Sequence, residues 1–198
     1  ARQKKLGVIP ADTVLTPRPD DVPSWDSMPE AFKPVLRRQM EVYAGFLEFT
    51  DHHVGRLFDV INNLGLADDT LIYYIIGDNG ASAEGSFNGC YNEMSYFNGL
   101  QYLETAEYLN GKLDDLGGPE SYNHFAVGWA HAMNTPYQWT KQVASHWGGT
   151  RNGTIVHWPK GVKGKGEIRT QFAHVIDVAP TILEAAGIPE PVSVDGIT

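Results

Sequence analysis

The chain has 198 residues, a length that suits one domain with a sizeable core. It carries 15 basic and 24 acidic side chains, for a formal charge of −9, and the basic residues form no dense cluster. This balance argues against nucleic-acid binding, and no apolar run is long enough to span a bilayer. The single cysteine, Cys90, excludes an internal disulfide and a zinc site built on cysteines.

The first third of the chain predicts an arm followed by a long helix. Residues 1–27 are rich in Pro and Asp and have no period, which indicates an extended surface arm. Ser27 and Glu30 have the spacing of a capping box, so we expect a helix to follow and to end near Leu64, with Gly65 as its terminator. Its apolar stripe, expected to be buried, is Tyr43, Leu47, Val54, Phe58 and Ile61. Asp51 falls on this stripe, where a buried acid needs a partner. It is therefore either a structural acid held by hydrogen bonds or a group that lies beneath a functional site.

Six apolar or aromatic residues at 71–76 predict a strand that is buried on both faces. The strand is followed by Gly77, Asp78, Asn79 and Gly80. In open α/β sheets, sites lie outside the carboxyl ends of strands, and a carboxylate beside a carboxamide suits a hard cation such as Ca²⁺ or Mg²⁺. The same residues also make an ordinary turn. This stretch therefore predicts an α/β fold, with Asp78 and Asn79 as candidate metal ligands.

The second half of the chain predicts two more helices and one more strand. Residues 81–99 form an irregular loop, in which Cys90 shows no sign of activation. A helix is expected from about Leu100 to Leu113, whereas 121–140 are aromatic-rich and have no clear period. Thr154 to Trp158 predict a strand, and Asp177 is expected to cap a helix that ends at Gly187.

Lys141 and Arg151 flank a turn at Gly148 and Gly149. A cation beside a glycine-rich turn could bind a phosphate or a sulfate, and the alternative is a pair of surface cations. Four histidines lie in this half of the chain, and each is either a general acid or a structural residue. They are His124, His131, His146 and His157.

Four segments, in order, resemble the sulfatase family of the alkaline phosphatase superfamily, and the bacterial arylsulfatases in particular. They cover roughly residues 40 to 190. The segments are Tyr43 to Leu57, Tyr74 to Gly80, Asn134 to Asn152 with Lys141 inside it, and His174 to Leu183.

The resemblance implies a mostly parallel, alkaline-phosphatase-like sheet with flanking helices. It also implies hydrolysis of sulfate esters, of aryl or carbohydrate type, by a formylglycine made from the Cys or Ser of a C/S-x-P-x-R motif. Asp78 and Asn79 would hold Ca²⁺, with Mg²⁺ less expected, and Asp78 would also accept the proton of the attacking hydroxyl. Lys141 would contact a sulfate oxygen or the leaving oxygen. The resemblance further implies a periplasmic or secreted location.

The sequence departs from this pattern at the nucleophile. Cys90 is followed by Tyr91 and Asn92, and no Ser or Cys begins a C/S-x-P-x-R motif. We therefore expect residues 1–198 to be an incomplete catalytic domain that lacks the nucleophile segment and a C-terminal subdomain, and that is inactive alone. Two alternatives stay open: a phosphonate monoester hydrolase or phosphodiesterase of the same superfamily, and a non-catalytic binding module in which Asp78 and Asn79 form only a turn. The oligomeric state is not indicated.

Overall fold

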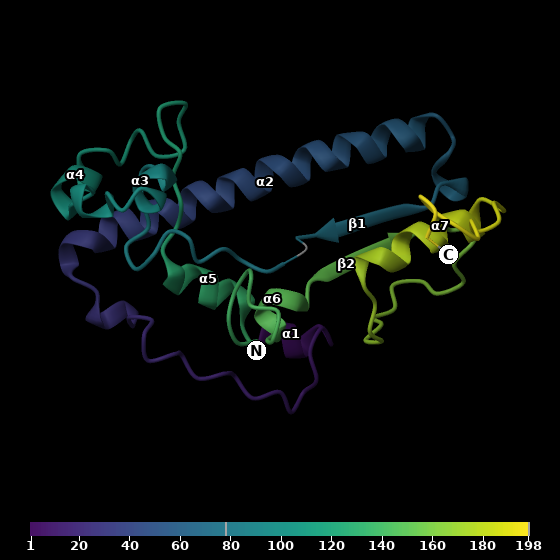
Figure 1. Ribbon diagram of the computed structural model, residues 1–198, viewed down its shortest axis with the longest axis horizontal. Coiled ribbons are helices and arrows are strands. Elements are labelled where there is room, and N and C mark those ends of the chain that lie inside the picture. Colours follow the sequence, from purple (N-terminus) through teal and green to yellow (C-terminus); the bar gives the residue numbers. More distant parts are fainter. Residues whose placement is uncertain (78, 198) are drawn as a thin grey trace.

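The computed structural model describes residues 1–77 and 79–197. One long helix, α2 (Lys33–Asn63), runs alongside a sheet of two strands, β1 (Ile72–Ile76) and β2 (Gly153–His157), and short helices gather near its N-terminal end (Figure 1). The other α-helices are α1 (Arg2–Lys5), α3 (Glu93–Phe97), α4 (Ala106–Asn110), α5 (Val127–Asn134), α6 (Trp147–Thr150) and α7 (Val178–Ala185). Short 3₁₀ turns are η1 (Trp25–Ser27), η2 (Glu30–Phe32), η3 (Ala67–Asp69), η4 (Gln101–Leu103) and η5 (Val175–Asp177). Within these residues, none of the helices has the length and apolar character needed to cross a membrane.

The start of α2 differs from the prediction, whereas its end agrees with it. Ser27 closes the turn η1, and the Ser24 hydroxyl accepts from the Ser27 N–H at 3.2 Å, so the predicted capping box is wrong. Pro29 has no N–H and an extended backbone, which separates η1 from η2, and α2 begins only at Lys33. The helix ends at Asn63, and Gly65 follows with a left-handed φ of 71°.

The core surrounds the first turns of α2. Its buried members come from α2, from α4 and from the segments after η1, before α3, after α4 and before α5: Met28, Val35, Leu36, Tyr91, Leu109, Leu116 and Ala126. The predicted stripe farther along α2 is only half-buried, Leu47 is 48% exposed and Asp51 lies on the surface. The sequence pattern overestimates the burial of this stripe, because the second half of α2 contacts the sheet at few points. There the ring centroids of Phe58 and Tyr74 lie 6.5 Å apart, beside a cavity of about 320 Å³.

The sheet confirms both predicted strands and supports an α/β fold, but it does not show the parallel arrangement. β1 pairs with β2 in antiparallel register, with Tyr74 opposite Ile155. These are the only two strands of the sheet formed by the described residues. The expectation that β1 is buried on both faces is wrong here, since Ile75 and Ile76 are 39% and 47% exposed. No further strand of the described chain flanks β1 to cover them.

The other helices differ from the sequence prediction where side chains bond to the backbone. The helix expected from Leu100 to Leu113 is divided into η4 and α4 at Thr105, which has an extended backbone and whose hydroxyl accepts from the Tyr108 N–H at 3.2 Å. The neighbouring Glu104 carboxylate accepts from the Tyr91 and Asn92 N–H groups at 2.6 and 3.0 Å. The helix α7 is confirmed, but the Asp177 carboxylate bonds back to the His174 N–H at 2.7 Å instead of capping α7. The helix α5 lies inside the aromatic-rich segment 121–140 and is not predicted, because it has no apolar period.

Candidate functional site

The loop that follows β1 packs directly against the Gly148–Gly149 turn. Asp78 lies outside the described residues, and the Asn79 side chain is exposed. The Gly80 N–H donates to Asn152 Oδ1 at 3.1 Å. A Cβ on Gly80 would lie only 1.9 Å from the Gly148 carbonyl oxygen, and Gly80 has a φ of +82°, so glycine is required for this approach. The strand end and the glycine turn, predicted separately, therefore meet in the structure.

The same loop is bonded to the segment that carries Lys141. The Lys141 N–H donates to the Ala81 carbonyl oxygen at 2.9 Å, only two residues beyond Asn79. The Ala81 N–H in turn donates to Asn134 Oδ1 at 3.1 Å, and Asn134 Nδ2 donates to the Trp139 carbonyl oxygen at 3.0 Å. Asn134 thus ties the loop to the turn before Lys141, and the backbones of two candidate site segments lie side by side.

The Lys141 ammonium is paired with Glu84, a residue that the sequence reasoning missed. Lys141 Nζ lies 2.8 Å from Glu84 Oε2. The Ser82 hydroxyl donates to the same oxygen at 2.5 Å, and Gln142 Nε2 donates to Oε1 at 3.1 Å. These hydrogen bonds, first the one from Lys141 and then the one from Ser82, hold the pKa of Glu84 below its usual value, although burial opposes them. The only signal in the sequence was an acid in the loop that follows the candidate ligands.

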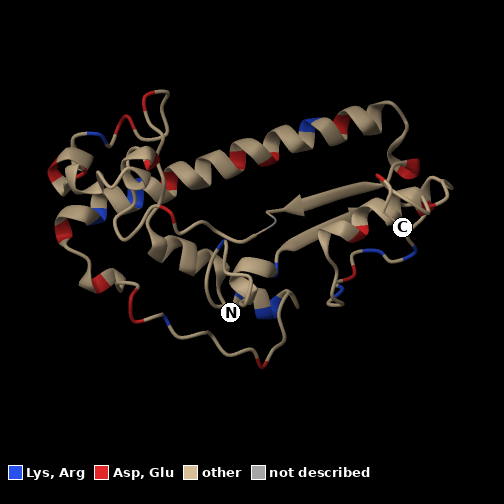
Figure 2. Cartoon of the chain, viewed as in Figure 1, with Lys and Arg blue, Asp and Glu red and all other residues tan. Residues whose placement is uncertain are grey.

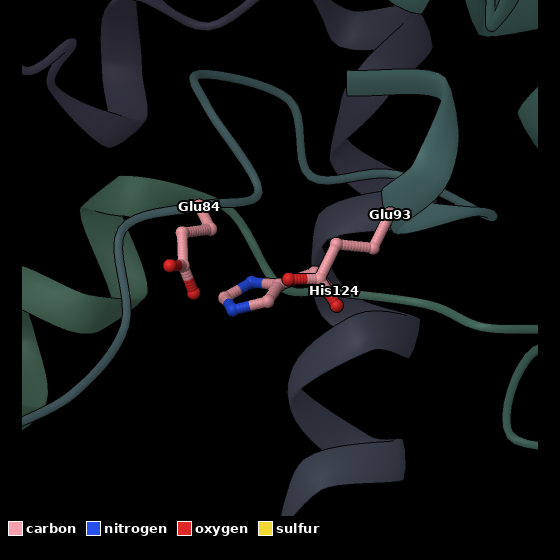
Figure 3. Close-up of side chains that lie close together, drawn as sticks. All are labelled: Glu84, Glu93 and His124. Atoms are coloured by element: carbon pink, nitrogen blue, oxygen red, sulfur yellow. The ribbon is translucent and has the colours of Figure 1, made fainter. Parts of the chain in front are cut away.

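Glu84 also belongs to a cluster with His124 and Glu93, in which the ring of His124 lies between the two carboxylates (Figure 3). One possible ligand atom from each residue lies within 4.8 Å of the others. His124 Nδ1 donates to the Phe125 carbonyl oxygen at 2.8 Å, which leaves the lone pair on Nε2. Both Glu84 oxygens already accept hydrogen bonds. The cluster is therefore better described as the Lys141–Glu84 ion pair with His124 and Glu93 beside it than as a cation site.

The other candidate groups have structural surroundings. The Arg151 guanidinium lies over the rings of Tyr137 and Trp147, at 5.3 and 4.8 Å from their centroids, which favours a packing role. Cys90 is free, as predicted, and 3% exposed, and burial together with Glu104 raises the pKa of its thiol to about 12.

The remaining histidines are dispersed. Burial, with a smaller effect of Arg18, lowers the pKa of His131. His146 Nδ1 lies 2.8 Å from the Ser145 hydroxyl at the start of α6, and His157 is exposed on β2. Figure 2 shows Lys and Arg scattered among acids rather than gathered in one patch. The exclusion of nucleic acid stays a prediction.

Comparison with known proteins identifies the family of this chain. The family model described as Sulfatase matches residues 11–188, most of the chain. This chain belongs to the sulfatase family. The sulfatase chain is 32% identical over 195 residues to an uncharacterized sulfatase of Schizosaccharomyces pombe, covering 96% of the chain and 32% of that protein. It is 28% identical over 191 residues to an arylsulfatase of Klebsiella aerogenes, covering 95% of the chain and 38% of that protein. The chain thus spans about a third of the length of these relatives.

Proposed function

We propose that this sulfatase chain forms part of the active site of a sulfuric ester hydrolase that acts on aryl sulfates. The observation that carries the proposal is the packing of the loop at 79–81 against the segment at 134–152, which contains Lys141. Family membership supports hydrolysis of sulfate esters, and the arylsulfatase relative favours an aryl leaving group.

Asp78 and Asn79 are proposed to hold Ca²⁺. A carboxylate and a carboxamide offer the oxygen atoms that Ca²⁺ prefers, and the exposed side chain of Asn79 is accessible to an ion. Mg²⁺ suits the pair less, because it demands a nearly ideal octahedron of ligands. When bound, the cation would stabilise the negative charge that develops on the sulfate oxygens.

Two side chains, Lys141 and Asp78, would act beside the cation during cleavage of the sulfate ester. The Lys141 ammonium would donate a hydrogen bond to a sulfate oxygen or to the leaving oxygen, where negative charge accumulates during cleavage. Asp78 would accept a proton from the attacking hydroxyl. The exposed fraction of the Lys141 side chain is 30%, so substrate can reach it without unfolding the loop.

The nucleophile is proposed to come from outside these residues. Cys90 does not fit the role, because it is buried, its pKa is raised to about 12 and its sequence context lacks the Pro and Arg of the C/S-x-P-x-R motif. No other position in the sequence has that motif. We therefore expect the 198-residue chain alone to give no turnover of an aryl sulfate, with or without Ca²⁺.

The test compares substrates on the full-length protein that carries this chain. We expect faster turnover of para-nitrophenyl sulfate than of the matching phosphonate monoester or phosphate diester, and a much lower but measurable sulfate turnover in Lys141→Met. Faster turnover of the phosphonate or the phosphate diester would favour the superfamily alternative. An absence of turnover and of Ca²⁺ binding would favour a binding module and refute the proposal. Turnover by the 198-residue chain alone would refute the external nucleophile.

A further inference from the structure

Two consecutive side chains, Lys141 and Gln142, reach the same carboxylate. Lys141 Nζ lies 2.8 Å from Glu84 Oε2, and Gln142 Nε2 lies 3.1 Å from Glu84 Oε1. Neighbouring side chains on an extended chain point in opposite directions. Gln142 has a φ of 74°, a left-handed conformation that is uncommon for residues other than glycine, and this turn lets both side chains face Glu84. Such a backbone persists only where its surroundings hold it.

Glu84 itself is held from several sides. The Ser82 hydroxyl donates to its carboxylate at 2.5 Å and accepts from its N–H at 3.3 Å. The next residue, Gly85, lies so close to the backbone of Phe125 that a Cβ on Gly85 would be 2.0 Å from the Phe125 carbonyl oxygen. The Glu84 side chain is 21% exposed, so its pairing with Lys141 is less screened than a surface ion pair. The Glu84 carboxylate is thus held by three donors, from Ser82, Lys141 and Gln142.

We propose that Glu84 is a positioning residue that holds the Lys141 ammonium beside the loop at the end of β1. This inference rests on the proposed function, in which Lys141 contacts a sulfate oxygen. A lysine side chain is a flexible stem with a point charge at its end, and an error of about 1 Å in the placement of a catalytic group can reduce a rate about 100-fold. Glu84 would fix the place of that charge without contacting the substrate.

The first readout is a double-mutant cycle in the full-length protein, with kcat and KM measured on para-nitrophenyl sulfate. We expect Glu84→Gln to lower kcat by about 10-fold or more with a smaller change in KM, since the placement of Lys141 is lost. In a Lys141→Met background the same substitution should change kcat by less than about 2-fold, because coupled residues are not additive. Glu93→Gln, which removes the carboxylate on the other side of His124, is the matched control and should leave kcat within about 2-fold of the parent.

The second readout does not depend on turnover. Brief acetylation of the folded protein, followed by mass spectrometry, measures the reactivity of the Lys141 amine. We expect Glu84→Gln to raise the acetylation rate of Lys141 about 3- to 10-fold, because the carboxylate no longer holds the amine as a paired ammonium. Glu93→Gln should change that rate much less.

The outcomes separate this inference from the proposed function. An equal kcat loss from Glu84→Gln in both backgrounds, or an unchanged acetylation rate of Lys141, would overturn the positioning role. If Lys141→Met keeps full activity, the proposed role of Lys141 fails, and the inference fails with it even if acetylation shows that Glu84 holds the amine. If Lys141→Met loses activity and Glu84→Gln does not, the proposed function stands and the inference is wrong.

Discussion

Replacing Gly80 by Ala tests how closely the loop after β1 must approach Gly148. The new Cβ would lie 1.9 Å from the Gly148 carbonyl oxygen, in a backbone with a φ of +82°. The left-handed backbone alone costs about 1–2 kcal/mol for a residue with a Cβ. Relief of the contact must separate the two backbones, which breaks the 3.1 Å hydrogen bond from Gly80 to Asn152, and a lost hydrogen bond costs about 1 kcal/mol more. We expect Gly80→Ala to reduce the free energy of unfolding by about 2–4 kcal/mol.

The assay is urea unfolding of the 198-residue chain, followed by circular dichroism and tryptophan fluorescence. Gly45→Ala is the matched control, since Gly45 lies within α2 and a Cβ there meets nothing within 4 Å. That substitution should stabilise the chain by up to about 1 kcal/mol, because Ala favours helix. An unfolding midpoint for Gly80→Ala equal to or above that of the parent chain would refute the close packing of the two segments.

Three further predictions concern residues whose surroundings are defined. Burial raises the pKa of Cys90 from 9.0 to about 12, so iodoacetamide should alkylate the native thiol about 1,000-fold more slowly than an ordinary thiol; equal rates in native and urea-unfolded chain would contradict this. Because the pKa of Glu84 is lowered in the folded chain, its ionised carboxylate stabilises the fold at pH values above the unfolded-state pKa of about 4.5. This stabilisation is lost as the pH falls through the folded-state pKa. The stability difference between the parent and Glu84→Gln, measured by urea unfolding, should therefore shrink between about pH 7 and pH 3, and a constant difference would oppose it. Leu109→Ala, at a fully buried position, should cost about 2–5 kcal/mol in urea unfolding, whereas Leu103→Ala, at a position 57% exposed, should cost far less.

The sequence predicts best those elements that depend on local patterns. The strands of the sheet, the end of α2 at Asn63 and the helix α7 are all marked by apolar runs or by glycine, and all are present. The predicted start of α2 is wrong because Ser24 caps the separate turn η1 and Pro29 divides η1 from η2, so α2 begins only at Lys33. The helix expected after Leu100 is divided at Thr105, which caps α4. The Glu104 carboxylate next to it bonds to two N–H groups more than ten residues away, and no local pattern shows such a contact.

The candidate site shows the same limit. The sequence gives Asn79 and Lys141 as separate candidates, and only the structure shows that their segments share hydrogen bonds through Ala81 and Asn134. Glu84 could not be found from the sequence, because one acid in a Ser- and Gly-rich loop is common. Its importance comes from the lysine that lies 57 residues later in the chain.

The expected burial of β1 depends on neighbours that the described residues do not provide. Its apolar run predicts cover on both faces, yet the strand has β2 as its one partner in this part of the molecule. The burial of the apolar stripe of α2 is overestimated for the same reason. Periodicity identifies which face of a helix is apolar but not how completely that face is covered.

The most direct test of the central claim is the Ca²⁺ dependence of aryl sulfate turnover by the full-length protein with Asp78→Ala or Asn79→Ala. If these residues hold the cation, each substitution should reduce turnover at least about 100-fold and raise the Ca²⁺ concentration needed for half-maximal rate. Asp69→Ala is the control, because Asp69 is an acid that pairs with Lys160 at 2.9 Å, and it should change neither quantity. Parent-like turnover and Ca²⁺ dependence in both Asp78→Ala and Asn79→Ala would contradict the account.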